Sequence, residues 1–164
     1  MTMTNLLELT IFGGTAVGMA LVSGVFLAFS DLVMRSLRRA SPTVGIEAMQ
    51  MINREVYGSA FLVALLGLVP VSGVLAVYAV LRIEGLASDW FVAGAAIYGI
   101  GVVLVTMLGN VPMNRRLDLM TSEAAQTRDY WQHYARRWTR LNHLRTLASA
   151  LAAAAFVAGT VLLV

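Results

Sequence analysis

The sequence predicts an all-α integral membrane protein: a four-transmembrane-helix bundle with cytoplasmic helical extensions, in which residues 1–164 form one membrane domain. Hydrophobic residues make up 59% of the chain and the mean hydropathy is +0.75, both too high for an ordinary soluble domain. Four stretches also lack Asp, Glu, Lys and Arg, and each is near the ~20 residues that a helix needs to cross a bilayer. These predicted spans are residues 9–30, 56–81, 90–110 and 146–164.

The first span differs from a signal peptide, because no basic residue precedes it and Glu8 stands directly in front of it. It is also longer than the ~7–15 apolar residues of a signal peptide. Asp31 and Arg35 follow the span four residues apart, which predicts an ion pair on a helix that continues past the apolar stretch. Ser41 and Pro42 then predict an N-cap followed by proline at the first position of a new helix.

Polar helix faces lead into the second and fourth spans. Glu47, Gln50 and Asn53 can share one face before the second span. A longer stripe precedes and enters the fourth span; it consists of Trp131, Tyr134, Trp138, Asn142 and Arg145. We expect the two helical extensions to pack on each other and to enclose a polar vestibule.

The basic residues are all arginines, and every one except Arg82 lies between the first and second spans or between the third and fourth. Because cytoplasmic loops of membrane proteins carry the excess of positive charge, both arginine-rich loops are predicted to be cytoplasmic and both termini outside. The pI of about 9.8 then follows from topology. It indicates anionic lipid headgroups, rather than nucleic acid, as the partner of the basic surface.

Several function classes are disfavoured or excluded by residues that the sequence lacks. The chain has no cysteine, which excludes disulfides and thiol chemistry. No acidic or basic residue lies within a predicted span, which disfavours small multidrug exporters and proton-coupled carriers. His133 and His143 are ten residues apart, about 280° around a helix, and are poorly placed to share a metal. No metal site is therefore predicted.

A polar cluster stands at the junction of the apolar spans with water. Pro112 removes a backbone donor at the end of the third span, so its neighbours Asn110 and Asn114 can either cap the freed carbonyls or bind a ligand carbonyl or hydroxyl. Trp138, Asn142 and Arg145 share one helix face. Trp138 can be an anchor at the membrane interface, or it can stack on a planar aromatic ligand. Arg145 can extend outward to a lipid phosphate, or it can point inward and pair with Asp31 or with a bound oxyanion.

Four blocks of this sequence resemble the DUF1772 family of small four-helix membrane proteins, which is grouped with the anthrone oxygenases. The blocks are Gly24–Asp31 with Met34–Arg35, Met49–Asn53, Asn110–Asn114 with Leu117, and Trp138–Thr146. The most specific parts are Pro-x-Asn near the end of the third span and Trp-x-x-x-Asn-x-x-Arg before the fourth. The resemblance covers nearly the whole chain and is closer to bacterial members, which implies a multi-pass protein of the bacterial plasma (inner) membrane.

The resemblance implies a monooxygenase that oxidises a polycyclic anthrone or phenol-type substrate with dioxygen and without a metal or flavin. An anthrone is a carbon acid, so the protein would have to deprotonate it, stabilise the enolate and exclude water. In the implied roles His143 or Asp31 is the base, Arg145 and Asn142 stabilise the oxyanion, Asn110 and Asn114 orient substrate hydroxyls, and Trp138 stacks on the rings. Gln50, Asn53 and Arg35 complete the predicted substrate-binding residues.

A second interpretation is a non-catalytic lipid- or quinone-binding module, or a structural subunit of a membrane complex. In that case the amides and Arg145 form a hydrogen-bond network that ties the helix ends together. The partners we predict are the lipid bilayer and a hydrophobic aromatic small molecule, and no nucleic acid. The sequence leaves open whether the chain forms a homo-oligomer.

Overall fold

The computed structural model describes residues 3–164, with side chains from Leu6 onward, and these residues form helices and no strand. The helices are α1 (Met3–Ala28), α2 (Met34–Arg39), α3 (Pro42–Glu55), α4 (Ala60–Arg82), α5 (Leu86–Tyr98), α6 (Val111–Asp118) and α7 (Ala125–Val161). Wider π-helical turns join α1 to α2 (Phe29–Val33) and α5 to α6 (Gly99–Leu104 and Thr106–Asn110), and a 3-10 turn (Val56–Gly58) follows α3.

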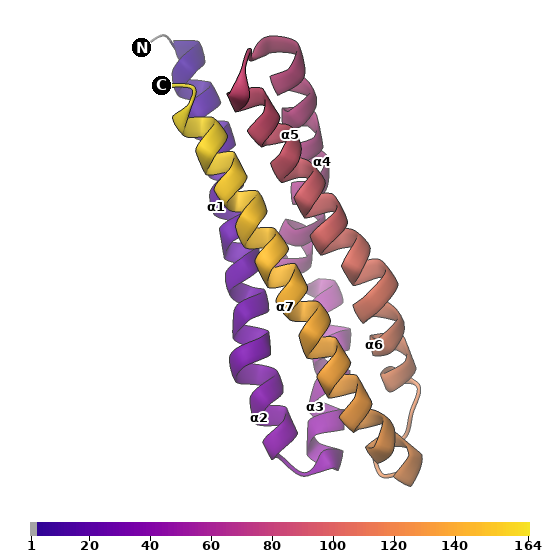
Figure 1. The fold of residues 1–164 in the computed structure, drawn as a ribbon. Coiled ribbons are helices and arrows are strands. Elements are labelled where there is room, and N and C mark those ends of the chain that lie inside the picture. Colours follow the sequence, from indigo (N-terminus) through magenta and orange to yellow (C-terminus); the bar gives the residue numbers. More distant parts are fainter. Residues whose placement is uncertain (1–2) are drawn as a thin grey trace.

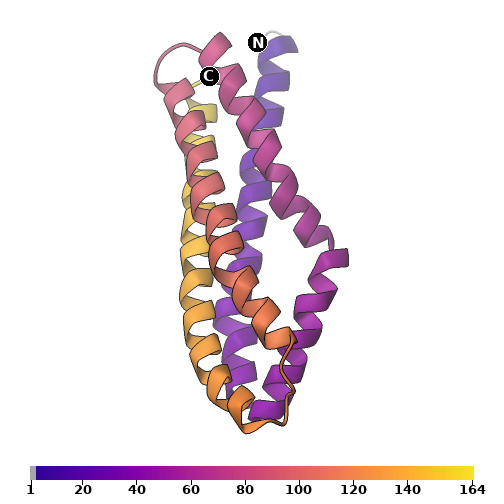
Figure 2. The same cartoon turned by 90° about the vertical axis from the view of Figure 1, so that its right-hand side faces the viewer.

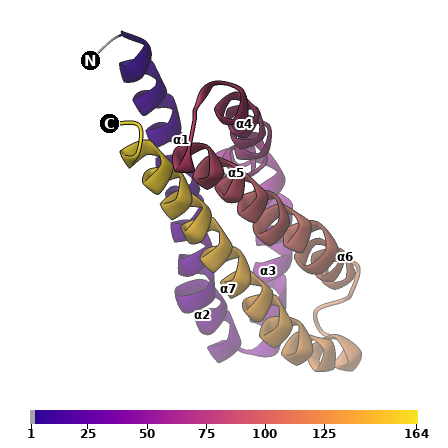
Figure 3. The ribbon, with the colours of Figure 1, turned by 45° about the horizontal axis from the view of Figure 1, so that its top comes forward.

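These elements form four rods, each long and apolar enough to cross a membrane, so the predicted membrane fold is confirmed. The rods are Leu6–Arg39, Ala60–Arg82, Leu86–Asp118 and Ala125–Val161. The two chain ends lie at one end of the bundle, and the α2–α3 and α6–α7 connections lie at the other (Figure 1). The long helix α7 runs between α1–α2 on one side and α5–α6 on the other (Figure 3).

The rods differ from the predicted spans mainly by being longer. The first and fourth helices continue past their apolar stretches, as expected, toward the end of the bundle that carries the arginine-rich connections. The third helix also continues through Pro112 to Asp118. A π turn accommodates the proline within the helix, and the Val111 N–H donates there to the carbonyl of Thr106, five residues earlier. Pro112 therefore changes the helix register and does not end the helix.

The second span begins later than predicted. Residues 56–58 form a 3-10 turn, and α4 starts at Ala60, where the Leu62 N–H donates to Ser59 Oγ at 3.2 Å. Gly58 and Ser59 together supply the break and the cap. In Figure 2, α4 slants away from α1 toward its junction with α3, and α3 turns back beneath it. The α3–α4 junction therefore projects from the bundle.

Two local predictions on the first connection have different outcomes. Arg35 Nη1 lies 3.4 Å from Asp31 Oδ1, which confirms the predicted ion pair, although both side chains are largely exposed and such a pair adds little stability. Ser41 does stand at the N-cap and Pro42 begins α3, as predicted, but the Ser41 side chain makes no capping hydrogen bond. The Ser41 carbonyl instead accepts from the Gly45 N–H at 3.0 Å.

The upper half of the bundle is held by an aromatic core and a polar seam. Phe12 stacks on Phe91 with their ring centroids 3.9 Å apart, and Phe156 packs edge-on against Phe91. Along the α1–α7 seam, Ser149 Oγ donates to the Met19 carbonyl at 2.7 Å, and Ser23 Oγ donates to the Thr146 carbonyl at 2.9 Å. Small residues and hydroxyls of this kind let helix backbones approach closely in an apolar medium.

A second core lies in the lower half, between the helical extensions. Its buried residues come from α2, α3, α6 and α7; they are Met34, Ile46, Met49, Leu117, Trp131, Tyr134, Ala135 and Trp138. The predicted packing of the two extensions is therefore present. The two cores meet at the level of Phe26 and Trp138, and the candidate site lies there.

Close helix packing around Phe156 depends on Gly94 of α5. A Cβ on Gly94 would lie 2.7 Å from Cδ2 of Phe156, whereas a Cβ on Gly24 of α1 would meet nothing within 4 Å. We expect Gly94→Ala to cost about 1–3 kcal/mol through overpacking and to lower the melting temperature in detergent. Gly24→Ala should leave it unchanged or raise it, because alanine favours helix. Equal effects of the two substitutions would contradict the packing described here.

Candidate functional site

The candidate site is a cavity of about 130 Å³ enclosed by α1, α3, α4, α6 and α7. Most of its wall is apolar or aromatic, and one end is polar. The apolar lining includes Phe26, Phe29, Met49, Ile52, Phe61 and Leu65. The polar end consists of Asn53, Thr106, Asn110, Asn114, Asn142 and Arg145, with Trp138 beside them. The predicted vestibule therefore exists, but as a mainly apolar cavity with one polar end.

Arg145 is the central group of the polar end. Its side chain points into the bundle and is 5% exposed, so it neither snorkels outward nor pairs with Asp31. Its guanidinium lies over the Phe26 ring at 4.4 Å and over the Trp138 ring at 5.4 Å, distances typical of cation–π contacts. Arg145 Nη1 donates to Thr106 Oγ1 at 3.3 Å. None of the ion pairs formed by the described residues includes Arg145.

Asn142 holds Arg145 in this position. Its Nδ2 donates to the Phe26 carbonyl at 2.5 Å and to Ser30 Oγ at 2.6 Å, which fixes the amide against α1. Its Oδ1 consequently faces Arg145 and accepts from Nη2 at 2.6 Å. Because Asn142 and Arg145 are one helical turn apart, α7 supplies both the charge and the group that orients it.

The two amides around Pro112 are used differently. Asn114 Oδ1 accepts from Tyr134 Oη at 2.8 Å and from Trp138 Nε1 at 3.0 Å, which joins α6 to α7. Asn110 is 1% exposed, and its amide is best oriented with Oδ1 toward Nη2 of Arg145 at 3.3 Å, because the opposite orientation sets its amino group against that donor. Asn110 therefore joins Thr106 and Asn142 in the group of side chains around the Arg145 guanidinium (the Arg145 cluster). Asn114 instead links α6 to α7 (the Asn114 tie).

Two buried nitrogens in this region have no hydrogen-bond partner: Nε of Arg145 and Nδ2 of Asn53. Both residues line the cavity. Buried polar groups in native proteins are nearly always paired, so two unpaired donors at one cavity are unusual. Both nitrogens are fully enclosed by protein atoms, so a molecule in the cavity can pair with them only after a small shift of the surrounding side chains.

The structure brings together six of the residues predicted from sequence and leaves four elsewhere. Those at the cavity are Asn53, Asn110, Asn114, Trp138, Asn142 and Arg145. Gln50 instead donates from Nε2 to the Leu117 and Met120 carbonyls, both at 2.8 Å, and so closes the end of α6. These contacts link α3 to the end of α6.

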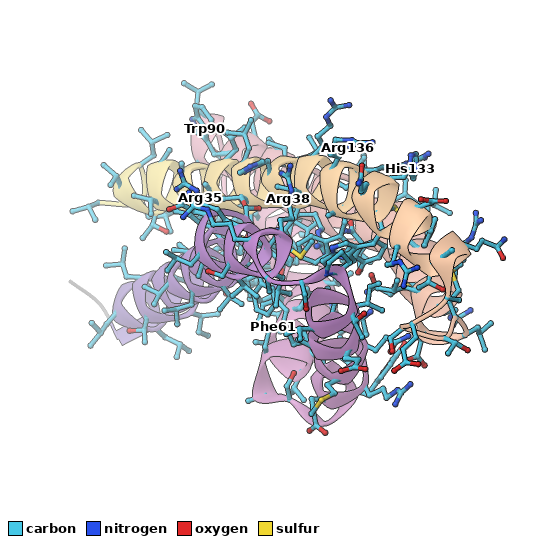
Figure 4. All side chains as sticks on the ribbon, turned by 90° about the horizontal axis from the view of Figure 1, so that it is seen from below. Arg35, Arg38, Phe61, Trp90, His133 and Arg136 are labelled. Carbon is cyan, nitrogen blue, oxygen red and sulfur yellow. The ribbon has the colours of Figure 1, made fainter. Side chains whose placement is uncertain are left out.

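The other three predicted residues, His143, Asp31 and Arg35, line a separate outer hollow with Arg38, Arg39 and Thr139. His143 is adjacent to Asn142 in sequence, but one residue rotates a helix by about 100°, which turns the imidazole outward. His143 and Asp31 are both exposed, and neither lines the cavity. Viewed from below, Arg35 and Arg38 lie on one side of α2, and Phe61 of the cavity wall lies on the other (Figure 4).

Thr106, Phe61 and Ser30 were not predicted as site residues. Thr106 carries a sequence signal that could have found it, because it is a polar residue in an apolar span, four positions before Asn110. Phe61 and Ser30 carry no such sequence signal. Phe61 lines the cavity because of the α3–α4 junction, and Ser30 contacts Asn142 because α1 packs against α7. Within residues 3–164, no three His, Asp or Glu side chains gather as a metal site would require.

Comparison with known proteins gives one match. The sequence model of a family described as anthrone oxygenase matches residues 54–155, which include α4 to α6 and most of α7. The matched segment contains five of the six cavity residues predicted from sequence, and Asn53 directly precedes it. No curated protein and no solved structure matches the chain.

The Asn114 tie predicts a specific pattern of stability changes. Asn114→Ala leaves the buried Tyr134 hydroxyl without this acceptor, at a cost of about 1–3 kcal/mol for a buried group left unpaired, whereas the Trp138 N–H keeps a second acceptor in Asn110 Oδ1 at 3.2 Å. We expect a lower melting temperature in detergent for Asn114→Ala, and a much smaller effect of Tyr134→Phe in that background than in the wild type. Additive effects in this double-mutant cycle would mean that the two side chains are not coupled.

Proposed function

The chain belongs to the anthrone oxygenase family, and from this premise we propose that it oxidises a polycyclic anthrone or phenol-type substrate with dioxygen in the cavity beside Arg145. The observation that carries the proposal is a buried guanidinium at the polar end of an aromatic-lined cavity, with no carboxylate partner among the described residues. This arrangement suits a planar, apolar substrate that develops negative charge on one oxygen during the reaction.

The proposed reaction needs only the substrate and dioxygen. Loss of one proton from the carbon opposite the anthrone carbonyl gives an enolate, which transfers an electron to dioxygen. The two radicals combine, and a carbon–oxygen bond forms at that carbon. The peroxide anion formed in this way takes up a proton from water. The carbon then loses its remaining proton, the oxygen–oxygen bond breaks, and hydroxide leaves and is protonated to water. One oxygen atom ends in the quinone carbonyl and the other in water, so we propose no bound cofactor and dioxygen as co-substrate.

The proposed roles follow the contacts within the cavity. Arg145 stabilises the enolate oxygen, and Asn142 positions the guanidinium through its contact with Nη2. Asn53 offers Nδ2 to a second oxygen of the substrate after a small shift of the side chains around it, and Asn110 supports the guanidinium of Arg145 from the π turn that precedes α6. Phe26, Phe61 and the edge of Trp138 form the aromatic wall against which the rings pack.

We also propose the setting in which this reaction takes place. The chain lies in a bacterial inner membrane, with both arginine-rich connections in the cytoplasm and both termini outside, which the positive-inside rule supports. An apolar substrate concentrates in the bilayer and reaches the cavity from the side of the bundle. Tyr57, which lines the cavity and is 68% exposed, marks that side.

A non-catalytic quinone-binding module is a second candidate, favoured by a specific observation. The two unpartnered donors, Nε of Arg145 and Nδ2 of Asn53, would satisfy the carbonyl oxygens of a quinone as well as those of an anthrone. The two candidates differ in turnover. Quinone binding without any acceleration of anthrone oxidation would favour the binding module.

The proposal predicts that Arg145→Gln slows oxidation of an anthrone by about 10²–10³-fold in kcat, which is typical for loss of one oxyanion donor. The measurement is the rate of quinone formation by purified protein in lipid nanodiscs, corrected for spontaneous oxidation. Arg136→Gln is the matched control, because Arg136 is an exposed arginine on the same helix and points away from the cavity (Figure 4). Wild-type protein that gives no increase over the spontaneous rate would sink the proposal.

A further inference from the structure

The cavity has an unusual charge balance. Among the described residues that line it, Arg145 carries the single formal charge; the other polar groups there are neutral amides, hydroxyls and an indole. The described residues that line the cavity include no carboxylate, imidazole or amine. An arginine this deeply buried normally has an acidic partner, because an unpaired charge is costly to remove from water.

The unpaired groups of the cavity are both donors. Arg145 donates from Nη1 to Thr106 and from Nη2 to Asn142, whereas its buried Nε and the buried Nδ2 of Asn53 have no hydrogen-bond partner. An occupant that completes the site must therefore bring acceptor oxygens. It must also bring negative charge if the guanidinium is to be neutralised.

We propose that the cavity selects the ionised form of its substrate, a planar phenolate or enolate, and does not itself remove the proton. This inference rests on the proposed function and deepens it. None of the carboxylates or imidazoles in the described part of the chain lines the cavity, so the proton passes to water or buffer before the anion is enclosed. The anion then binds with its charged oxygen at Arg145.

The size of the cavity sets how much of the substrate enters. A volume of about 130 Å³ is close to the ~150 Å³ of an apolar protein cavity that binds benzene. One oxygen-bearing ring therefore fits inside, and the other rings of a polycyclic substrate extend past Phe61 and Tyr57 toward the surface of the bundle. A single-ring phenol is accordingly a sufficient probe of the binding site.

The test uses 4-nitrophenol, whose phenolate absorbs visible light while the phenol does not. Wild-type protein in nanodiscs is titrated with pH at saturating protein, and the pKa of the bound probe is compared with that of the probe in empty nanodiscs. A cation within ~4–6 Å of an acid lowers its pKa by about 1–3 units, so a decrease of at least one unit is expected. Arg145→Gln should abolish the decrease and Arg136→Gln should retain it.

A second comparison does not depend on the folding of any variant. 4-Nitroanisole has the same ring and nitro group but cannot ionise, so wild-type protein should bind it at least tenfold more weakly than 4-nitrophenol above the pKa of the bound phenol. Equal affinities, an unchanged or raised pKa of the bound probe, or no binding of 4-nitrophenol at all would each overturn the inference.

Turnover separates this inference from the proposed function. A lowered pKa of the bound probe without anthrone oxidation would sink the oxygenase and retain the anion site. If oxidation occurs, the pH at which kcat/KM rises should shift with the acidity of the anthrone used. A rise at the same pH for anthrones of different acidity, lost in His143→Gln, would show that a protein base operates and that the inference is wrong.

Discussion

The amide of Asn142 is the contact on which the rest of the site depends. It reaches from α7 to α1, where it donates to the Phe26 carbonyl and to Ser30 Oγ, and it presents its remaining oxygen to Arg145. Another polar side chain could not replace Asn142, because both the amino group and the oxygen of its amide form hydrogen bonds. The same contact fixes the distance between α1 and α7 at the level of the cavity, and thereby the position of the Phe26 ring under the guanidinium.

Irregular helix geometry supplies the opposite wall. The π turn before Pro112 carries Thr106 and Asn110 at its two ends, and both contact the guanidinium of Arg145, Asn110 in its preferred amide orientation. Residues four positions apart share one face of a helix, so Thr106 and Asn110 both point toward α7. This spacing aims two polar residues of one helix at a single cation, and the π turn lets that helix continue through Pro112.

The sequence was sufficient to predict the four membrane helices, because apolar stretches of this length without a charged residue are typical of membrane spans. It also predicted the stripe from Trp131 to Arg145, since helical periodicity alone places those residues on one face. It could not locate His143 and Asp31 relative to the cavity, because a shift of one helical position separates a buried residue from an exposed one. The α3–α4 break was also missed, because Gly58 and Ser59 stand within an uninterrupted apolar stretch.

The α1–α7 seam also has a consequence for the biogenesis of the protein. Its contacts join the first and the fourth membrane rod of this sequence, so Phe26 and Ser30 acquire their partner Asn142 only after the intervening helices have been made. The last helix is the least apolar of the four rods and carries the buried arginine, which makes it the poorest candidate for independent insertion into a bilayer. Asn142 finds its hydrogen-bond partners on the first rod, and the cavity, which both rods line, is complete only once they have met.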